Sequence, residues 1–131
     1  MTLSNPSELG GVYSATYTPF TPTGDLNPDM IERIVEFHIE SGLAGFYLTG
    51  STGEHYALSV EERKLVVETV VRANRGRRKV IVHTGHISTD TAVDLTRHAE
   101  KAGADAVSAT APSYIGFGFE QTKRHYDTIA R

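Results

Sequence analysis

The sequence contains no cysteine, which excludes disulfide bonds and thiolate chemistry. No apolar run approaches the ~20 residues that a membrane-spanning helix needs, so no membrane partner is expected. Basic residues are not in excess: the formal net charge is −3, which predicts no binding surface for nucleic acid or anionic lipid. The N-terminus, MTLSNPSELGG, lacks the basic and apolar regions of a signal peptide. A cytoplasmic location is therefore expected.

The composition is that of an ordinary globular domain. Apolar residues make up 39% of the 131 residues and charged residues 22%. Low-complexity segments and linkers are absent, so residues 1–131 are expected to form a single unit. Four mostly apolar stretches predict β-strands, over residues 11–20, 44–50, 79–85 and about 105–112.

A segment with helical periodicity follows each predicted strand. The signals for helix starts are Asn27 followed by Pro28, a capping box of Ser59 and Glu62, a cap at Ser88 or Thr89, and a start near Phe119. The signals for helix ends are Gly42, Gly76 and Gly103.

The alternation of strands and helices indicates an α/β fold with a parallel sheet. Two architectures fit: an open doubly wound sheet, and four units of a TIM, or (βα)8, barrel. A complete barrel takes ~250 residues, so in the second case the chain is a parallel (βα)4 segment, the first half of a TIM barrel. The fourth helix continues to Arg131 without a stop signal. A half barrel exposes two strand edges and the inward faces of its strands, which must pair with another surface.

The stretch GSTGE follows the second predicted strand. Gly50 and Gly53 allow a sharp turn and leave amide groups open, while Ser51 and Thr52 add hydroxyl donors. This combination suits a carboxylate or a phosphate. A tight turn whose hydroxyls bond to their own backbone explains the same residues. Glu54 fits substrate binding or a favourable interaction with the helix dipole.

Other polar residues also allow two interpretations. His83 and His86 resemble a metal-ligand pair, but no third ligand is apparent, so local hydrogen bonding or the lining of a polar cleft is favoured. Tyr114, in the loop after the fourth strand, is either a proton relay or an aromatic anchor at an interface. Arg63 belongs to the charged run EERK, which is interpreted as a solvated helix face.

Taken together, the strand ends resemble the pyruvate-dependent class I aldolases, the family of N-acetylneuraminate lyase and dihydrodipicolinate synthase. The motifs that carry the resemblance are TPF at 18–20, GSTGE at 50–54, LSVEER at 58–63 and AEKAGADAVSATAPSY at 99–114. The similarity runs from about Gly10 to Arg131. The serine in GSTGE is typical of the N-acetylneuraminate lyase branch; dihydrodipicolinate synthase and a 2-keto-3-deoxy sugar acid aldolase stay open as alternatives.

The resemblance implies a TIM barrel and a lysine that forms a Schiff base with pyruvate, whose partner is an aldehyde or sugar acid. No metal or organic cofactor is expected. The matching positions imply that Gly50, Ser51, Thr52 and Gly53 bind the pyruvate carboxylate. Ser51 and Tyr114 are implied to be catalytic: Ser51 joins a proton relay, and Tyr114 reaches across a subunit interface of a homo-oligomer.

The Schiff-base lysine of this family lies on a later strand, beyond the fourth helix. The lysines of this chain fall on helices or at a strand start, at Lys64, Lys79, Lys101 and Lys123. These are not the strand ends where chemistry takes place, so the 131-residue chain alone is expected to be inactive. Ser113 stands where the family usually has an aromatic residue. The alternative from another class is a non-catalytic half barrel that binds a carboxylate or assembles with a partner.

Overall fold

The computed structural model describes residues 6–113 and 116–131. A short 3-10 helix, η1 (Pro6–Leu9), precedes four strand–helix pairs. These are β1 (Tyr13–Ala15) and α1 (Pro28–Glu40), β2 (Gly45–Leu48) and α2 (Val60–Asn74), β3 (Lys79–His83) and α3 (Thr89–Ala102), and β4 (Ala106–Ser108) and α4 (Phe119–Ile129).

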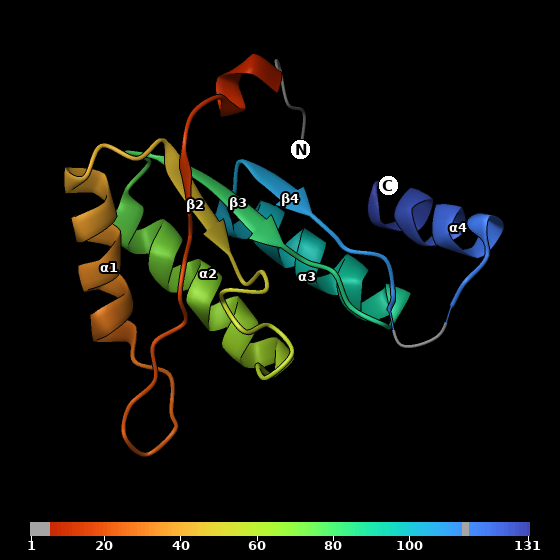
Figure 1. Ribbon diagram of the computed structural model, residues 1–131, viewed down its shortest axis with the longest axis horizontal. Helices are drawn as coiled ribbons and strands as arrows, with labels where there is room; N and C mark the ends of the chain where they lie inside the picture. The colour runs from red at the N-terminus through yellow and green to blue at the C-terminus, as the bar shows by residue number, and fades with distance from the viewer. Residues whose placement is uncertain (1–5, 114–115) are drawn as a thin grey trace.

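The four strands form one parallel sheet in the order β1-β2-β3-β4. Helices α1, α2 and α3 lie on the same face of this sheet, and α4 lies beside it against α3 (Figure 1). A doubly wound sheet carries helices on both faces. The arrangement therefore confirms the other predicted architecture, a parallel (βα)4 segment equivalent to the first half of a TIM barrel.

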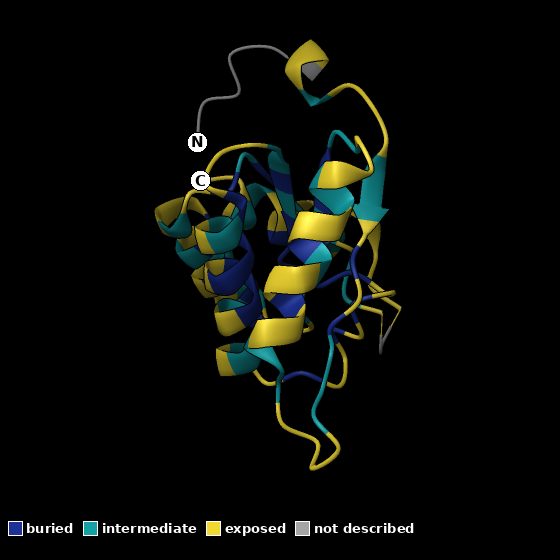
Figure 2. Cartoon of the chain, turned by 90° about the vertical axis from the view of Figure 1, so that its left-hand side faces the viewer, coloured by how far each residue is buried: buried dark blue, intermediate teal, exposed yellow. Residues whose placement is uncertain are grey.

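The hydrophobic core lies between the sheet and the three helices, where the buried residues gather (Figure 2). Phe46 and Leu48 of β2 and Val80 and Val82 of β3 point toward the helices and are at most 3% exposed. Successive strand residues point to opposite faces, so the intervening Tyr47 faces the other side, where it is only half-buried. One face of the sheet is thus covered, and the face that lines the inside of a barrel is open.

The helix starts follow the caps predicted from the sequence. The Asn27 side chain accepts a hydrogen bond from the backbone N–H of Met30 over 3.1 Å at the start of α1. At the start of α2, the Ser59 hydroxyl accepts from the N–H of Glu62 (3.2 Å), whose carboxylate accepts from the N–H of Ser59 (2.7 Å). Ser88 caps α3. Each cap satisfies backbone donors that the helix itself leaves free.

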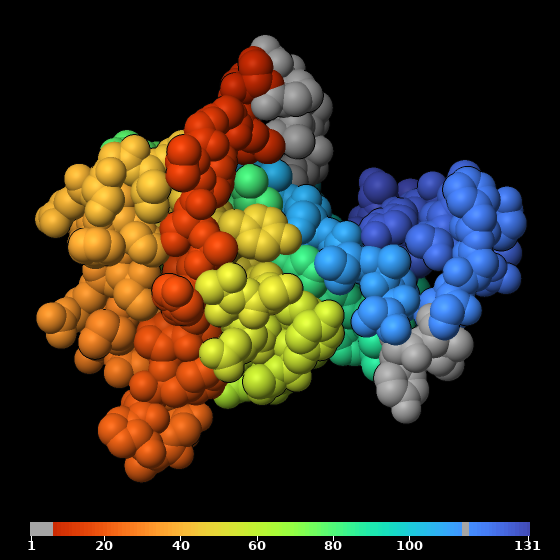
Figure 3. All heavy atoms as spheres, in the orientation of Figure 1, coloured from red at the N-terminus to blue at the C-terminus, as the bar shows by residue number. Residues whose placement is uncertain are grey.

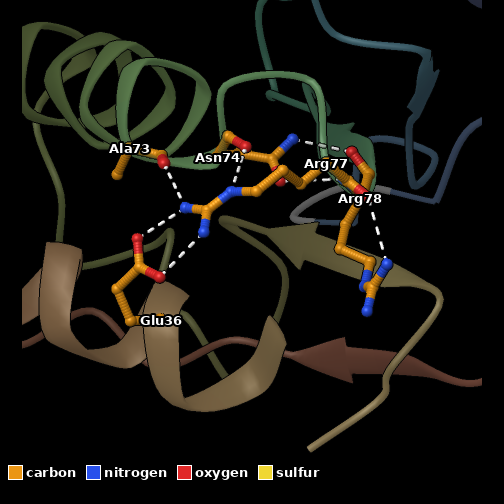
Figure 4. Close-up of polar contacts among 5 residues, drawn as sticks. All are labelled: Glu36, Ala73, Asn74, Arg77 and Arg78. Carbon is orange, nitrogen blue, oxygen red and sulfur yellow. Dashed lines mark hydrogen bonds and ion pairs between the residues drawn. The ribbon is translucent and has the colours of Figure 1, made fainter. Parts of the chain in front are cut away.

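The connection between α2 and β3 contains Arg77 and Arg78, whose polar contacts are drawn in Figure 4. Arg77 makes a two-pronged ion pair with Glu36 of α1, with N···O distances of 2.5 and 2.9 Å. Asn74 donates to the carbonyl of Arg78 (2.7 Å) and accepts from its N–H (3.0 Å). These contacts hold α1, α2 and the start of β3 together at the edge of the sheet where the strands begin.

The strands are shorter than the sequence predicted. β1 has three residues, although the N–H of Thr16 still donates to the carbonyl of Tyr47 over 3.1 Å. β2 ends at Leu48, just before Thr49, whose left-handed φ of 50° departs from the extended backbone of a strand.

Candidate functional site

The loop after β2 is a tight turn between two residues with left-handed backbone, Thr49 (φ 50°) and Glu54 (φ 55°). The N–H of Glu54 donates to the carbonyl of Ser51 (3.0 Å), and the N–H of His55 donates to the carbonyl of Gly50 (3.4 Å). The turn therefore has internal order before α2 begins at Val60.

The two glycines of the turn are needed because other groups lie close to them; neither has a positive φ. A Cβ on Gly50 would lie 2.4 Å from Cε1 of Tyr47, and a Cβ on Gly53 would lie 3.1 Å from the Cα of Thr49. The Gly53 carbonyl also accepts the hydroxyl of Thr18 over 2.8 Å, from the segment after β1 that lies beside the turn in Figure 3. The sharp changes of direction fall at Thr49 and Glu54 rather than at the glycines expected from the sequence.

Ser51 and Thr52 are exposed and line a cavity of about 210 Å³, with Tyr47, His83 and Thr110 among its other walls. Within residues 6–113 and 116–131, no hydrogen bond engages either hydroxyl. The bonds to their own backbone that the sequence left open are therefore not found in this part of the chain. Both hydroxyls are free to donate to a ligand in the cavity, such as a carboxylate.

The structure brings four of the predicted site residues together in this turn: Gly50, Ser51, Thr52 and Gly53. Tyr114, the fifth, lies outside the described residues, so its assignment stays a prediction. Pro112 and Ser113, which precede Tyr114, line a second cavity of about 200 Å³ beside the first.

His83 lies at the end of β3 and is 2% exposed. Its Nδ1 is 3.1 Å from the carbonyl oxygen of Thr49, and its Nε2 is 3.3 Å from the backbone nitrogen of Thr110. Burial, with smaller contributions from His55 and Arg63, lowers the pKa of His83 to about 4, so the ring is neutral at neutral pH. The predicted hydrogen-bonding role in a polar cleft matches this geometry.

The second member of the histidine pair has a separate contact: His86 Nδ1 accepts the N–H of Ser88 over 3.0 Å. Among the described residues, no group of three His, Cys, Asp or Glu side chains is arranged to hold a metal ion.

The interpretation of Arg63 as part of a solvated face is wrong. Arg63 is 3% exposed, and its guanidinium donates to the carbonyls of His83 (2.7 Å) and Gly85 (3.1 Å). It shares the buried face of α2 with Val66, Val67 and Val70 at spacings of three, four and seven residues. That spacing is the sequence signal that identifies Arg63 as an inward-facing residue.

Two residues that line the second cavity, His55 and Arg63, each have a buried polar atom with no hydrogen-bond partner among the described residues, Nδ1 of His55 and Nε of Arg63. Burial lowers the pKa of His55 below its usual value and that of Arg63 to about 10. Arg63 therefore stays charged at neutral pH and His55 stays neutral. Sequence reasoning found no role for His55, because no pattern of partner residues accompanies it in the sequence.

No lysine of the chain lines the cavity beside Ser51 and Thr52. Lys64 pairs with Asp94 of α3 (2.6 Å), and Lys79 pairs with Asp105 (2.8 Å) at the edge where the strands begin. The Asp105 carboxylate raises the pKa of Lys79 above its ordinary value, which disfavours the neutral amine that imine formation needs. Lys101 and Lys123 lie on α3 and α4.

Within the described segments, no helix has the length and apolar character required to cross a membrane.

Residues 8–131 match the model of the dihydrodipicolinate synthetase family. The chain is 40% identical over 123 residues to the N-acetylneuraminate lyase of Shigella boydii serotype 4, an alignment that covers 94% of this chain and 41% of the relative. The chain thus spans about two-fifths of the length of this relative.

Solved structures show the same half-length match. A catalytic lysine mutant of Ruminococcus gnavus sialic acid aldolase has a TM-score of 0.93 at 31% identity, covering 96% of this chain and 41% of that one. Dihydrodipicolinate synthase from Aquifex aeolicus has a TM-score of 0.88 at 35% identity, covering 92% of this chain and 41% of that one.

Proposed function

Because the chain belongs to the dihydrodipicolinate synthetase family, we propose that it is the carboxylate-binding part of a pyruvate-dependent carbon–carbon lyase of the N-acetylneuraminate lyase type. The observation that carries this proposal is the ordered turn of residues 50–53. Ser51 and Thr52 line a cavity there, and their hydroxyls have no hydrogen-bond partner among the described residues. Residues 1–131 act as one half-barrel unit in this proposal, and the complete enzyme is a homo-oligomer.

In the proposed reaction, a lysine amine that lies outside this chain condenses with the keto group of pyruvate to form an imine. A carbon–carbon bond to an aldehyde or sugar acid is then formed or broken. The residues of this chain bind and orient the acid: the turn holds the carboxylate through Ser51 and Thr52, with Gly50 and Gly53 allowing close approach. Ser51 also passes a proton toward the reacting atoms, together with Tyr114 from a neighbouring subunit.

The turn binds the carboxylate with neutral donors. His83 lines the cavity as a neutral ring, and Arg63 points its guanidinium at backbone carbonyls. Hydrogen bonds from hydroxyl and amide groups to an ionised carboxylate stabilise by ~1.5–3 kcal/mol each. Removing one hydroxyl should therefore weaken binding measurably without removing it.

The binding test uses Thr52→Val, which keeps the shape of the side chain and removes its hydroxyl. In a pyruvate titration followed by NMR, we expect Thr52→Val to weaken binding by about tenfold, the equivalent of ~1.4 kcal/mol. Thr128→Val, the same change on exposed α4, is the matched control and should leave the affinity unchanged. Equal affinities in both variants would remove the turn from the binding site.

The covalent test uses borohydride reduction in the presence of pyruvate, followed by mass spectrometry. The 131-residue chain should gain no adduct, because none of its lysines lies at the cavity. A chimera in which residues 1–131 replace the matching segment of the Shigella boydii lyase should gain one adduct, on a lysine from the lyase. An adduct on Lys64, Lys79, Lys101 or Lys123 would contradict the proposal.

The proteins that match this chain include both N-acetylneuraminate lyases and dihydrodipicolinate synthases, so the identity of the aldehyde partner is part of the proposal. The N-acetylneuraminate lyase type is favoured by the first curated relatives, and dihydrodipicolinate synthase or a 2-keto-3-deoxy sugar acid aldolase is the alternative. The turnover rate of the chimera is measured with each aldehyde and compared with that of the parent lyase, so that any difference reports the contribution of residues 1–131. A lower preference of the chimera for the N-acetylneuraminate lyase reaction, relative to the parent lyase, would favour the alternatives.

A second candidate function is a non-catalytic half barrel that binds a carboxylate or assembles with a partner. The observation that favours it is the open face of the sheet, with β1 and β4 at the two ends of the strand order. Unpaired edges and a partly apolar face favour association. Sedimentation analysis tests it, because a stable folded monomer would rule out the assembly role.

A further inference from the structure

The contacts of His83 select one tautomer of its ring. The backbone N–H of Thr110 donates to Nε2 over 3.3 Å. A backbone N–H is only a donor, so Nε2 carries the lone pair and the ring proton lies on Nδ1. Nδ1 is 3.1 Å from the carbonyl oxygen of Thr49 and donates to it. The side chain therefore links the end of β4 to the end of β2.

Thr49, whose carbonyl accepts this hydrogen bond, has a strained backbone. Its φ is 50°, and a β-branched residue in the left-handed region needs support from its surroundings. The Thr49 hydroxyl donates to the carbonyl of His83 over 2.9 Å, so Thr49 and His83 form a reciprocal pair of hydrogen bonds. The chain continues from Thr49 through Gly50 into Ser51 and Thr52, so the two hydrogen bonds between Thr49 and His83 hold the point from which the turn leaves the sheet.

The ring is confined on its other sides. A Cβ on Gly85 would lie 2.8 Å from Nε2, so that only glycine fits beside the ring. Arg63 holds the His83 carbonyl over 2.7 Å, and the ring of His55 lies 4.5 Å away between centroids. Both ring nitrogens are engaged, which leaves neither of them free to bind a ligand in the cavity.

We propose that His83 is a positioning residue for the turn of residues 50–53: its Nδ1–H, acting through the Thr49 carbonyl, sets the direction in which Ser51 and Thr52 present their donors to a carboxylate. The inference rests on the proposed function, since it gives His83 a part in binding pyruvate. The inference goes beyond the proposed function because it assigns the positioning of the turn to one ring nitrogen, Nδ1, and to one tautomer of His83.

Two substitutions separate the two ring nitrogens. In His83→Asn the side-chain NH₂ stands in for Nδ1–H, whereas in His83→Gln the longer amide reaches the Nε2 position. Pyruvate affinity of the 131-residue chain is measured from NMR shifts of the Ser51 and Thr52 amides. We expect His83→Asn to stay within about threefold of the parent and His83→Gln to lose about tenfold or more. His98→Gln, on α3 and paired with Glu68, is the matched control and should bind like the parent.

Two readouts do not depend on pyruvate. The ¹⁵N shifts of the His83 ring should show the proton on Nδ1. Amide exchange of Glu54 and His55, whose N–H groups close the turn, should accelerate in His83→Gln but not in His83→Asn, while exchange at Ala99 in α3 stays unchanged.

These readouts distinguish a failure of the proposed function from a failure of the role proposed for His83. If the parent chain does not bind pyruvate, the proposed function fails, and the tautomer and the exchange rates still decide the role of His83. A proton on Nε2, or equal effects of the two substitutions on affinity and exchange, would overturn the inference, because the turn would then not depend on Nδ1–H.

Discussion

Replacing Arg63 by methionine tests whether a buried arginine fixes the end of β3. Arg63 is 3% exposed, and its guanidinium donates to the carbonyls of His83 and Gly85. Methionine keeps a long apolar stem that can pack in the same place. The substitution therefore removes mainly the charge and its two hydrogen bonds.

The size of the expected change in stability follows from the hydrogen bonds that the two carbonyls lose. A hydrogen bond from a charged group contributes ~1.5–3 kcal/mol. The His83 carbonyl keeps the Thr49 hydroxyl as a second donor at 2.9 Å, whereas the Gly85 carbonyl keeps no other partner among the described residues. Desolvation lowers the pKa of Arg63 to about 10 and offsets part of the gain from the charge. We expect the free energy of unfolding to fall by about 2 kcal/mol.

Urea unfolding measures this change, with Arg33→Met as the matched control. Arg33 is exposed on α1, so the same substitution there should change the free energy of unfolding by less than ~0.5 kcal/mol. A solvated Arg63 would behave like Arg33. Equal changes in the two variants would refute the reasoning, because they would show that the two hydrogen bonds contribute nothing.

Three further changes should alter stability in the same assay. The pKa of His83 is about 4 in the folded chain, against 6.5 for an ordinary histidine. The free energy of unfolding should therefore fall by up to about 3 kcal/mol as the pH is lowered from 6.5 toward 4. His83→Asn, which lacks the imidazole, should show a smaller loss over the same pH range. Ser59→Ala removes the cap of α2 and should cost ~1 kcal/mol; no change would mean that the cap is not formed in solution. Gly50→Ala places a Cβ 2.4 Å from Cε1 of Tyr47 and should cost ~1–3 kcal/mol, whereas Gly116→Ala, with nothing within 4 Å, should cost far less.

The helices could be predicted from the sequence because their signals are local. Asn27, Ser59 and Ser88 cap the helices where the sequence placed them. The strand ends could not be predicted: β2, for example, ends at Leu48 because of the backbone of Thr49. Its left-handed φ is specified by contacts with His83, 34 residues away, and no local pattern of residues reports such a contact.

The turn of residues 50–53 could be predicted as a candidate site because its composition is unusual and it follows a strand. The residues that support the turn could not be predicted. His83 is held by Thr110, 27 residues further along the chain, so neither its tautomer nor its partner is visible in the sequence. Arg63 was predictable in principle from its spacing to Val66 and Val70, but the charged run around it favoured a solvated face.

Among the described residues, the turn has supports from several elements of the chain, and this has a consequence for the proposed reaction. Thr18 holds Gly53, His83 holds Thr49, and Arg63 fixes the strand end next to them. In the proposed reaction, the lysine that forms the imine lies outside the chain. Binding of the carboxylate and formation of the imine are therefore separable: the first depends on contacts within β1, β2, β3 and α2, and the second on a segment that completes the barrel. The isolated chain should bind pyruvate without reacting, and restoring the lysine should restore the reaction without reshaping the turn.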